Sequence, residues 1–440
     1  MKTYKKLKFV ELREFDLWDI KRYTSEKLKS TFNIEKLSNC IKEENRKYKL
    51  YLEEDKTFGI LGVNNKDGIF DAYEQKGKEI NQPYKKMEIG WLAYNPYRIN
   101  VGSIGIRKKE HLYQYISPAY VVFSCLDNLL PEYLYLLFRT ERFIKIINES
   151  TTGSVRQNLT SEILKTLEIP LPPLSDQETI VKNYCDKITQ ATTYEQQAET
   201  LEKKIESYLF ESLGIEELDK RKKIGLNIIE SKRMERWDIP FLMGESSLKS
   251  KYSIHRMGEY IVEIATGTTP PTSRKEYFRG DINFYTPSDI NNKILLNADR
   301  KVSLLAVKDK KVRVFKKNTL LFVGIGSTVG KVGIIGNEFA TSNQQITGFN
   351  VDENMLLTEY VYYYFTYFKN VTTKEQTKAT LPIVNQEKIM NILIPIPPKE
   401  TQQAIIKQID TYKNEIKILR ERATLLKQQA EQEFEQTIFS

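Results

Sequence analysis

The chain has 440 residues, a formal net charge of +9 and 40% hydrophobic residues. This length exceeds one ordinary core and predicts at least two domains, while the positive charge favours a polyanionic partner. No apolar run is long enough to span a membrane, and the charged N-terminus lacks the apolar stretch of a signal peptide. We therefore expect a cytoplasmic protein without membrane association. Three widely spaced cysteines and only two histidines disfavour a disulfide framework, a zinc site and histidine acid–base chemistry.

Four pairs of short segments, in the same order, show that the chain repeats itself once. The pairs are Trp18-Asp19-Ile20 with Trp237-Asp238-Ile239, GSIGI (102–106) with GKVGI (330–334), LPEYLYLLF (130–138) with LTEYVYYYF (357–365), and IPLPP (169–173) with IPIPP (394–398). Their offsets lie between 219 and 228 residues. We infer a tandem duplication of a unit of about 220 residues.

Each predicted unit begins with a mixed region of short β-type runs, such as 120–126 and 319–325, broken by Gly, Pro and Asn. A double-proline stretch follows, which is extended and prevents a helix from starting earlier. A long helix completes the unit. The predicted fold class is therefore α+β, with two tandem mixed domains that are each followed by a long helix.

The two helices are predicted at 175–214 and 400–440, and the first contains no Gly or Pro before Gly214. Ser175 and Glu178 have capping-box spacing, and Gly214 is a suitable C-terminal stop. Apolar positions recur at spacings of three and four, which predicts a coiled coil between the helices. We expect the two helices to pair antiparallel. Two surface helices that each pack on their own domain are the alternative. The predicted seam comprises Tyr184, Ile188, Ala191, Tyr194, Ala198, Leu201, Ile205 and Tyr208 in the first helix, and Ile409, Tyr412, Ile416, Leu419, Ala423, Leu426 and Ala430 in the second.

Three segments resemble catalytic motifs, and each is incomplete. FVGIG at 322–326 has the shape of a motif that binds S-adenosylmethionine, but the nearest partner loop, Asn95-Pro96-Tyr97, lacks a second proline and lies in the other repeat. GIGSTVGKV at 324–332 lacks the first Gly and the final hydroxyl of a P-loop, so its glycines are better explained by a turn between strands. Glu54-Asp55-Lys56 has no convincing partner carboxylate. We therefore predict no catalytic, cofactor-binding or metal-binding residue.

The remaining candidate residues are polar loop side chains of the kinds that contact DNA. Arg and Lys contact guanine edges or phosphates, and Asn and Gln pair with adenine edges. Loops that mix such groups occur in both units, although plain surface polarity would give the same pattern. The candidate DNA-binding residues are Arg107, Lys108, Lys109, Arg156, Gln157 and Asn158 in the first unit, and Ser273, Arg274, Lys275, Arg279, Lys331, Asn343, Gln344 and Gln345 in the second.

Over nearly its whole length the chain resembles the specificity (S) subunits of type I restriction–modification enzymes. The second unit carries GTTPPTSRKEYFRGDINFYTPSDI (267–290), TLLFVGIGSTVGKVGI (319–334) and TSNQQITGF (341–349), and the first carries YNPYRINVGSIGI (94–106), SPAYVVF (117–123) and GSVRQNL (153–159). IPLPPLSDQETIV (169–181) is similar to the start of the family's spacer helix, and IPIPPKETQQAII (394–406) departs from it mildly.

This resemblance implies target-recognition domains at 1–174 and 233–399, spacer helices at 175–214 and 400–440, and a linker at 215–232. It implies that the two domains read the halves of a split site in double-stranded DNA and that the helices set the gap between them. The implied partners are two methyltransferase (M) subunits, which bind S-adenosylmethionine and methylate adenine at N6, and motor-nuclease (R) subunits, which use ATP and Mg. No cofactor is expected on this chain.

Two other classes of protein remain as alternatives. The chain could be a DNA methyltransferase or a fused restriction enzyme with its own S-adenosylmethionine site, which would require the complete Asn-Pro-Pro-Tyr loop that this sequence lacks. It could also be a structural adaptor or an RNA-binding protein, and competition between duplex DNA and RNA would separate that class from a DNA reader.

Overall fold

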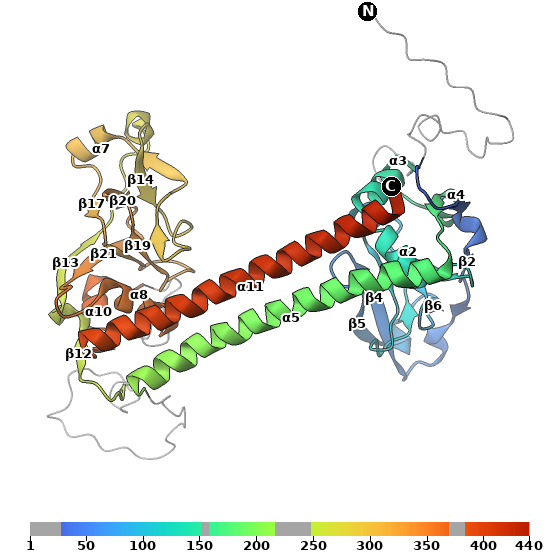
Figure 1. Cartoon of the computed structure of the whole chain (residues 1–440), viewed down its shortest axis with the longest axis horizontal. Coiled ribbons are helices and arrows are strands. Elements are labelled where there is room, and N and C mark those ends of the chain that lie inside the picture. The colour runs from blue at the N-terminus through green and yellow to red at the C-terminus, as the bar shows by residue number, and fades with distance from the viewer. Residues whose placement is uncertain (1–27, 151–157, 216–247, 369–382, 440) are drawn as a thin grey trace, which may run out of the picture. The chain divides into compact units, whose positions relative to one another are not determined.

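A computed structural model describes residues 28–150, 158–215, 248–368 and 383–439 (Figure 1). The chain forms two compact units. Unit 1 contains residues up to Glu195 and from Arg420 onward, and unit 2 contains Gln196–Leu419. Each unit thus combines one mixed domain with a segment of both long helices. The tryptophan motifs at 18–20 and 237–239, and residues 216–232 of the predicted linker, lie outside the described residues.

Within its described residues, the unit 1 domain contains three sheets of two, four and five strands, with orders β1-β11, β2-β10-β7-β8 and β3-β6-β9-β4-β5. Short helices cover them. The strands are β1 (Ile34–Lys36), β2 (Ile41–Glu43), β3 (Lys47–Tyr48), β4 (Thr57–Asn64), β5 (Gly68–Lys76), β6 (Tyr84–Lys86), β7 (Leu92–Tyr94), β8 (Ile104–Ile106), β9 (Tyr115–Ile116), β10 (Val121–Cys125) and β11 (Glu168–Pro170). The helices are α2 (Pro131–Leu137), α3 (Glu141–Ser150) and α4 (Ser161–Thr166).

The unit 2 domain repeats this plan with orders β12-β22, β13-β21-β18-β19-β15 and β16-β14-β20-β17. The strands are β12 (Ile254–Arg256), β13 (Ile261–Thr266), β14 (Ile282–Tyr285), β15 (Ile294–Leu295), β16 (Arg300–Val302), β17 (Val314–Lys316), β18 (Leu320–Val323), β19 (Val332–Ile335), β20 (Phe339–Ser342), β21 (Ile346–Val351) and β22 (Leu393–Pro395). The helices are α7 (Leu304–Lys308), α8 (Thr358–Tyr367) and α10 (Gln386–Met390).

The element order confirms the duplication that the sequence predicts. In both units a two-stranded sheet joins the start of the domain to the double-proline stretch, with β1 antiparallel to β11 and β12 antiparallel to β22. The strands β2, β10, β7 and β8 occupy the same sheet positions as β13, β21, β18 and β19. The two remaining sheets differ between the units in strand number and order. The duplicated part of the fold is therefore the part nearest the long helices.

A fully buried glutamine fixes each long helix to its own domain. The Gln177 amide donates to Pro172 O (2.8 Å) and Asn128 O (3.0 Å), and its oxygen accepts from Leu130 N (2.8 Å). In unit 2 the amide nitrogen of Gln402 donates to Pro397 O and Met355 O (both 2.9 Å), and its oxygen accepts from Leu357 N (2.9 Å). One amide side chain thus satisfies three backbone groups at each junction, and its bond to the proline carbonyl is buried.

The long helices are α5 (Leu174–Leu213) and α11 (Lys399–Phe439). Gly214 ends α5 as predicted: it lies in the left-handed region (φ 58°), and Ile215 N donates to Phe210 O (2.9 Å). The predicted capping box is wrong. Because Pro173 O already accepts from Asp176 N and Gln177 N, the helix starts before Ser175, whose hydroxyl donates to Asp176 instead.

Segments of α5 and α11 pair in both units. In unit 1, Tyr184 and Phe434 pack edge to face with ring centroids 5.9 Å apart, and Lys187 pairs with Glu433 at 2.7 Å. In unit 2, the rings of Tyr208 and Tyr412 are 6.1 Å apart. The early part of α5 thus meets the late part of α11, and the late part of α5 meets the early part of α11. The helices pair as an antiparallel coiled coil, which confirms the predicted fold class.

Burial along both helices follows the coiled-coil spacing. All fifteen predicted seam positions are buried or half-buried, while most of the intervening positions are exposed. Ala191, Ala198, Ile409 and Ala423 are fully buried, and Ala430 is almost so. Small alanines at these positions allow close helix packing.

A serine closes the C-terminal end of each long helix. Ser250 Oγ donates to Leu213 O at 2.5 Å and accepts from Tyr252 N at 3.2 Å, at the start of the unit 2 domain. Ser30 Oγ donates to Ile438 O at 2.5 Å and accepts from Phe32 N at 3.1 Å. The start of the first domain therefore holds the end of the last helix, just as the start of the second domain holds the end of α5.

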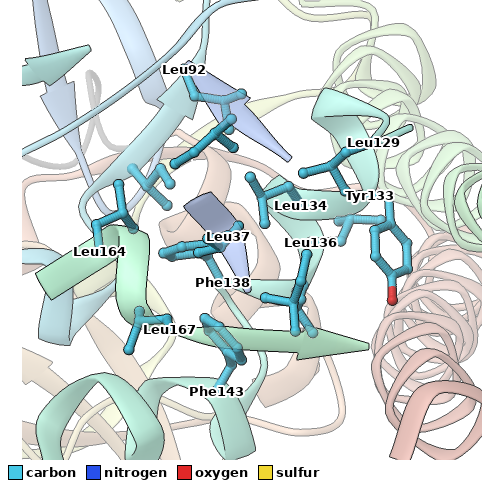
Figure 2. Packing of buried hydrophobic residues seen from close by; sticks show 14 of the residues in the cluster. Leu37, Leu92, Leu129, Tyr133, Leu134, Leu136, Phe138, Phe143, Leu164 and Leu167 are labelled. Carbon is cyan, nitrogen blue, oxygen red and sulfur yellow. The ribbon is translucent and has the colours of Figure 1, made fainter. Parts of the chain in front are cut away.

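The cores of the two units differ in composition. In unit 1 one large cluster, part of which is drawn in Figure 2, joins Leu37 and Phe138 to Tyr133 of α2 and Phe143 of α3, and the end of α11 enters it through Phe434. In unit 2 the corresponding helix α8 is rich in aromatic residues: Phe365 packs against Phe322 and Phe349, and Tyr364 stacks on Phe368 at 4.6 Å. Both arrangements bury apolar area against a long helix.

Candidate nucleic-acid interface

Equivalent hairpin loops lie next to the predicted recognition residues in both units. Strands β7 and β8 pair antiparallel and are joined by residues 95–103, and strands β18 and β19 are joined by residues 324–331. Gly326 (φ 111°) and Gly330 (φ 89°) shape the second loop, in backbone conformations that L side chains rarely adopt. This confirms that the glycines of FVGIG form a turn between strands. The two partial methyltransferase motifs therefore occupy the same structural position in different units.

In unit 1 this loop exposes an aromatic and a basic side chain that the sequence analysis did not select. Tyr97 is 57% exposed and Arg98 is also exposed. Leu159 N donates to Pro96 O (3.1 Å), which places Asn158 beside the loop. Asn158 Oδ1 is buried and has no hydrogen-bond partner among the described residues. Arg156 and Gln157 lie outside the described residues.

The basic run at 107–109 contains residues with different environments. Arg107 is only 9% exposed, and its guanidinium donates to Tyr113 O (2.9 Å) and Met87 O (3.1 Å). These bonds tie the end of β8 to two neighbouring segments, and this geometry does not favour a DNA contact by Arg107. Lys108 and Lys109 are exposed, and Lys108 lies 3.6 Å from Glu110.

In unit 2 hydrogen bonds join three loops into one surface. Arg313 N donates to Thr268 Oγ1 (2.7 Å), Thr269 Oγ1 donates to Gln344 Oε1 (2.5 Å), and Tyr277 donates to Asp309 (2.8 Å). This surface carries the predicted residues Ser273, Arg274, Lys275, Arg279 and Gln344, all exposed.

Arg274 keeps its charge at this surface. Its Nη1 donates to Tyr277 Oη (3.1 Å), and this hydrogen bond, followed by the nearby acidic groups, raises the pKa of the guanidinium. The same surface exposes four basic residues that the sequence analysis missed: Lys308, Lys310, Lys311 and Arg313. The dense positive charge of 308–317 was the available signal.

Two of the three remaining predicted residues of unit 2 line a polar cavity of about 470 Å³. Asn343 and Gln345 line it together with residues 325–328 of the hairpin loop, residues 286–288 after β14, and Asp299 and Arg300 at the start of β16. Lys331 lies outside this lining, and its Nζ donates to Asn291 Oδ1 (3.1 Å). The structure thus brings Asn343 and Gln345 together with polar groups that are distant in sequence.

Within the described ranges, no group of three or more His, Cys, Asp or Glu side chains could hold a metal ion. None of the helices in those ranges is both long and apolar enough to cross a bilayer.

The fold is that of two repeated units, each with a polar hairpin loop and a segment of the paired long helices. Residues 22–203 and 252–428 match the family model "Type I restriction modification DNA specificity domain". The chain belongs to this family.

Two relatives agree with this assignment. The chain is 33% identical over 153 residues to the type I restriction enzyme MjaIX specificity subunit of Methanocaldococcus jannaschii, covering 33% of this chain and 34% of the relative. It is 25% identical over 298 residues to a protein of the same organism named as a type I restriction enzyme MjaX specificity subunit, covering 67% of this chain and 64% of the relative. The chain thus spans less than two thirds of either relative.

A solved chain described under "Structural basis underlying complex assembly and conformational transition of the type I R-M system" shares the fold. Its TM-score is 0.62 at 16% identity, with 94% of this chain and 99% of that chain covered.

Proposed function

We propose that this chain is the sequence-reading subunit of a type I restriction–modification complex and that each unit reads one half of a split site in double-stranded DNA. The observation that carries the proposal is the repeated placement of a polar hairpin loop, β7–β8 or β18–β19, on a domain fixed to the paired helices by Gln177 or Gln402. Two similar frameworks with different loops suit two different half-sites.

The exposed basic residues of unit 2 supply the chemistry for binding the DNA backbone. Lysine and arginine side chains that neutralise phosphates release counterions and give affinity without sequence preference. The Arg274 guanidinium and the exposed basic residues of 308–313 lie on one hydrogen-bonded surface, since Tyr277 joins their two loops. Sequence preference would then come from polar side chains nearby, such as Asn343 and Gln345.

In this proposal the chain carries no catalytic centre of its own. Two methyltransferase subunits supply S-adenosylmethionine and adenine-N6 methylation, and motor-nuclease subunits supply ATP- and Mg-dependent cleavage. Acting on cellular DNA places the complex in the cytoplasm. Mixing the purified chain with S-adenosylmethionine and cognate DNA should transfer no methyl group until methyltransferase subunits are added. Robust transfer by the chain alone would favour the alternative enzyme class.

Domain exchange tests the reading function directly. Residues 1–174 are replaced by the first domain of another family member, and methylated motifs are sequenced from cells that also express the methyltransferase subunit. We expect one half of the methylated motif to change and the other half to stay. A change in both halves, or in neither, would contradict one reading domain per unit.

A further inference from the structure

The polar cavity of unit 2 has a floor whose hydrogen-bonding direction is fixed by the backbone. Gln345 N is a donor and lies 3.1 Å from Asn343 Oδ1, so this oxygen must be the acceptor. The other end of the Asn343 amide is therefore Nδ2, which donates to Gln345 Oε1 at 2.9 Å. The orientation of the Asn343 amide therefore also sets the orientation of the Gln345 amide. The Gln345 oxygen faces Asn343, and its Nε2 makes no hydrogen bond to Asn343.

The free amide nitrogen lies next to the hairpin loop. A Cβ built on Gly326 would come within 3.6 Å of Gln345 Nε2. Gly326 itself has a φ of 111°, a backbone conformation that other residues rarely adopt, and this shapes the loop beside Gln345. Gln345 thus presents two N–H donors into a cavity that residues 325–328 also line.

A basic and an acidic side chain line the same cavity. Arg300 and Asp299 are both exposed, and both belong to the lining. Among the described residues, no ion pair or hydrogen bond engages the Arg300 guanidinium or the Asp299 carboxylate. The cavity therefore combines donors from Gln345 and Arg300 with an acceptor from Asp299.

We propose that this cavity reads one G·C base pair through its major-groove edge, an inference that rests on the proposed function. Guanine presents two acceptors, O6 and N7, that match the N–H donors of Gln345 and Arg300, and cytosine presents the N4 donor that matches the Asp299 carboxylate. The usual glutamine–adenine pair uses the amide oxygen and nitrogen together, whereas here the oxygen is turned toward Asn343. A backbone phosphate would meet the Asp299 carboxylate, which repels it.

The test exchanges the donor for an acceptor without changing the shape of the side chain. In Gln345→Glu one carboxylate oxygen can still accept from Asn343, while the other faces the cavity as an acceptor. The full-length chain and its variants are incubated with a pool of randomised duplexes, and the bound fraction is sequenced. The wild type should select a split site with a G·C pair at one position of the half read by unit 2. Gln345→Glu should lower that preference by roughly 5- to 150-fold and leave the other positions unchanged.

Two further variants act on exposed side chains and are compatible with folding. Arg300→Ala should weaken the preference for guanine, and Asp299→Asn the preference for cytosine, at the same base pair. Gln403→Glu adds the same negative charge as Gln345→Glu at an exposed position of α11, and it should bind like the wild type. Thermal unfolding of every variant confirms that each is folded.

The outcomes separate this proposal from the proposed function. If the wild type selects no split sequence, the proposed function fails, and the present inference fails with it. If the wild type selects a split site and the three cavity variants keep every base preference, only the G·C assignment is overturned. A uniform loss of affinity with unchanged preferences would overturn it as well, because that result marks a phosphate contact.

Discussion

The two units attach their long helices by the same hydrogen bonds at the start and by different contacts further along. Gln177 and Gln402 make matching bonds, and Tyr133 and Tyr360 donate to Pro170 O and Pro395 O at 2.9 and 2.8 Å. These bonds recur because the proline stretch leaves the same carbonyls to satisfy in each copy. The framework that orients a domain on its helix is thus shared.

Further along the helices the chemistry differs. In unit 2, Lys293 Nζ lies 3.0 Å from both Asp410 oxygens, 3.2 Å from Tyr363 Oη and 2.6 Å from Glu359. Burial raises the pKa of Tyr363, and its hydrogen bond to Asp410 raises it further. In unit 1, at the offset of 225 residues, Cys185 stands in place of Asp410, and the nearby contact is the Tyr184–Phe434 ring pair. The two junctions therefore share the hydrogen bonds that satisfy backbone groups, and they differ in the contacts between side chains.

The largest expected effect comes from removing the shared glutamines. Gln177→Leu or Gln402→Leu leaves three backbone groups without partners, and we expect each to lower the free energy of unfolding by about 3–5 kcal/mol. Urea denaturation measures the change. Gln403→Leu, at an exposed neighbouring position, should stay within about 0.5 kcal/mol. A large loss in one unit and almost none in the other would show that the two junctions are not equivalent.

The polar network of unit 2 should give the next largest effect. Lys293→Met leaves the carboxylates of Asp410 and Glu359 without their cation, and we expect a loss of about 2 kcal/mol, because Asp410 is partly exposed and solvent screens its charge. The double variant Lys293→Met with Asp410→Leu should recover much of that loss, since it resembles the apolar attachment of unit 1. Chemical denaturation of both variants tests this, and an undiminished loss in the double variant would refute the comparison.

Removing the serine at the end of each long helix should have a smaller effect on stability, and the effect should differ between the units. Ser30→Ala and Ser250→Ala each remove a bond to a terminal carbonyl, with an expected cost of about 1 kcal/mol. The cost should be smaller for Ser250, because Lys251 N also donates to Leu213 O at 3.1 Å. Hydrogen exchange at the last turns of α5 and α11 would report the difference. Equal protection in both variants would mean that Lys251 does not compensate.

The smallest effect concerns acid stability. Burial opposes ionisation of Glu43 in unit 1, but hydrogen bonds from Ser161, Lys165 and Asn45 lower its pKa below the ordinary 4.5. A lowered folded pKa stabilises the protein above pH 4.5 and loses that contribution as the pH falls through the folded pKa.

Glu43→Gln should therefore cost less than about 1 kcal/mol at pH 7 and reduce the loss of stability on acidification. Glu263→Gln, at the exposed position 220 residues later, is the matched control. Unfolding curves between pH 3 and 7 measure both, at pH values on either side of about 4.5. Identical acid profiles for Glu43→Gln and the wild type would contradict the assignment.

The duplication, the α+β class and the two paired helices could all be predicted from the sequence alone. These follow from local signals: a repeated order of motifs, the absence of Gly and Pro over 175–213, and spacings of three and four residues. Gly214 also followed from local chemistry, because only a left-handed residue ends the helix in this way.

Which polar side chains form a surface could not be predicted from the sequence, because it depends on how distant segments pack. Arg107 looked like a free basic residue, but it donates to Tyr113 O and Met87 O, both of which are distant in sequence. The structural role of Gln177 and Gln402 could not be predicted from the sequence, because each is one glutamine in a helix and its partners come from other segments. The lining of the unit 2 cavity likewise joins Arg300 to Gln345 through strand order. Local pattern specifies secondary structure, whereas the pairing of distant donors and acceptors depends on how the strands and loops pack.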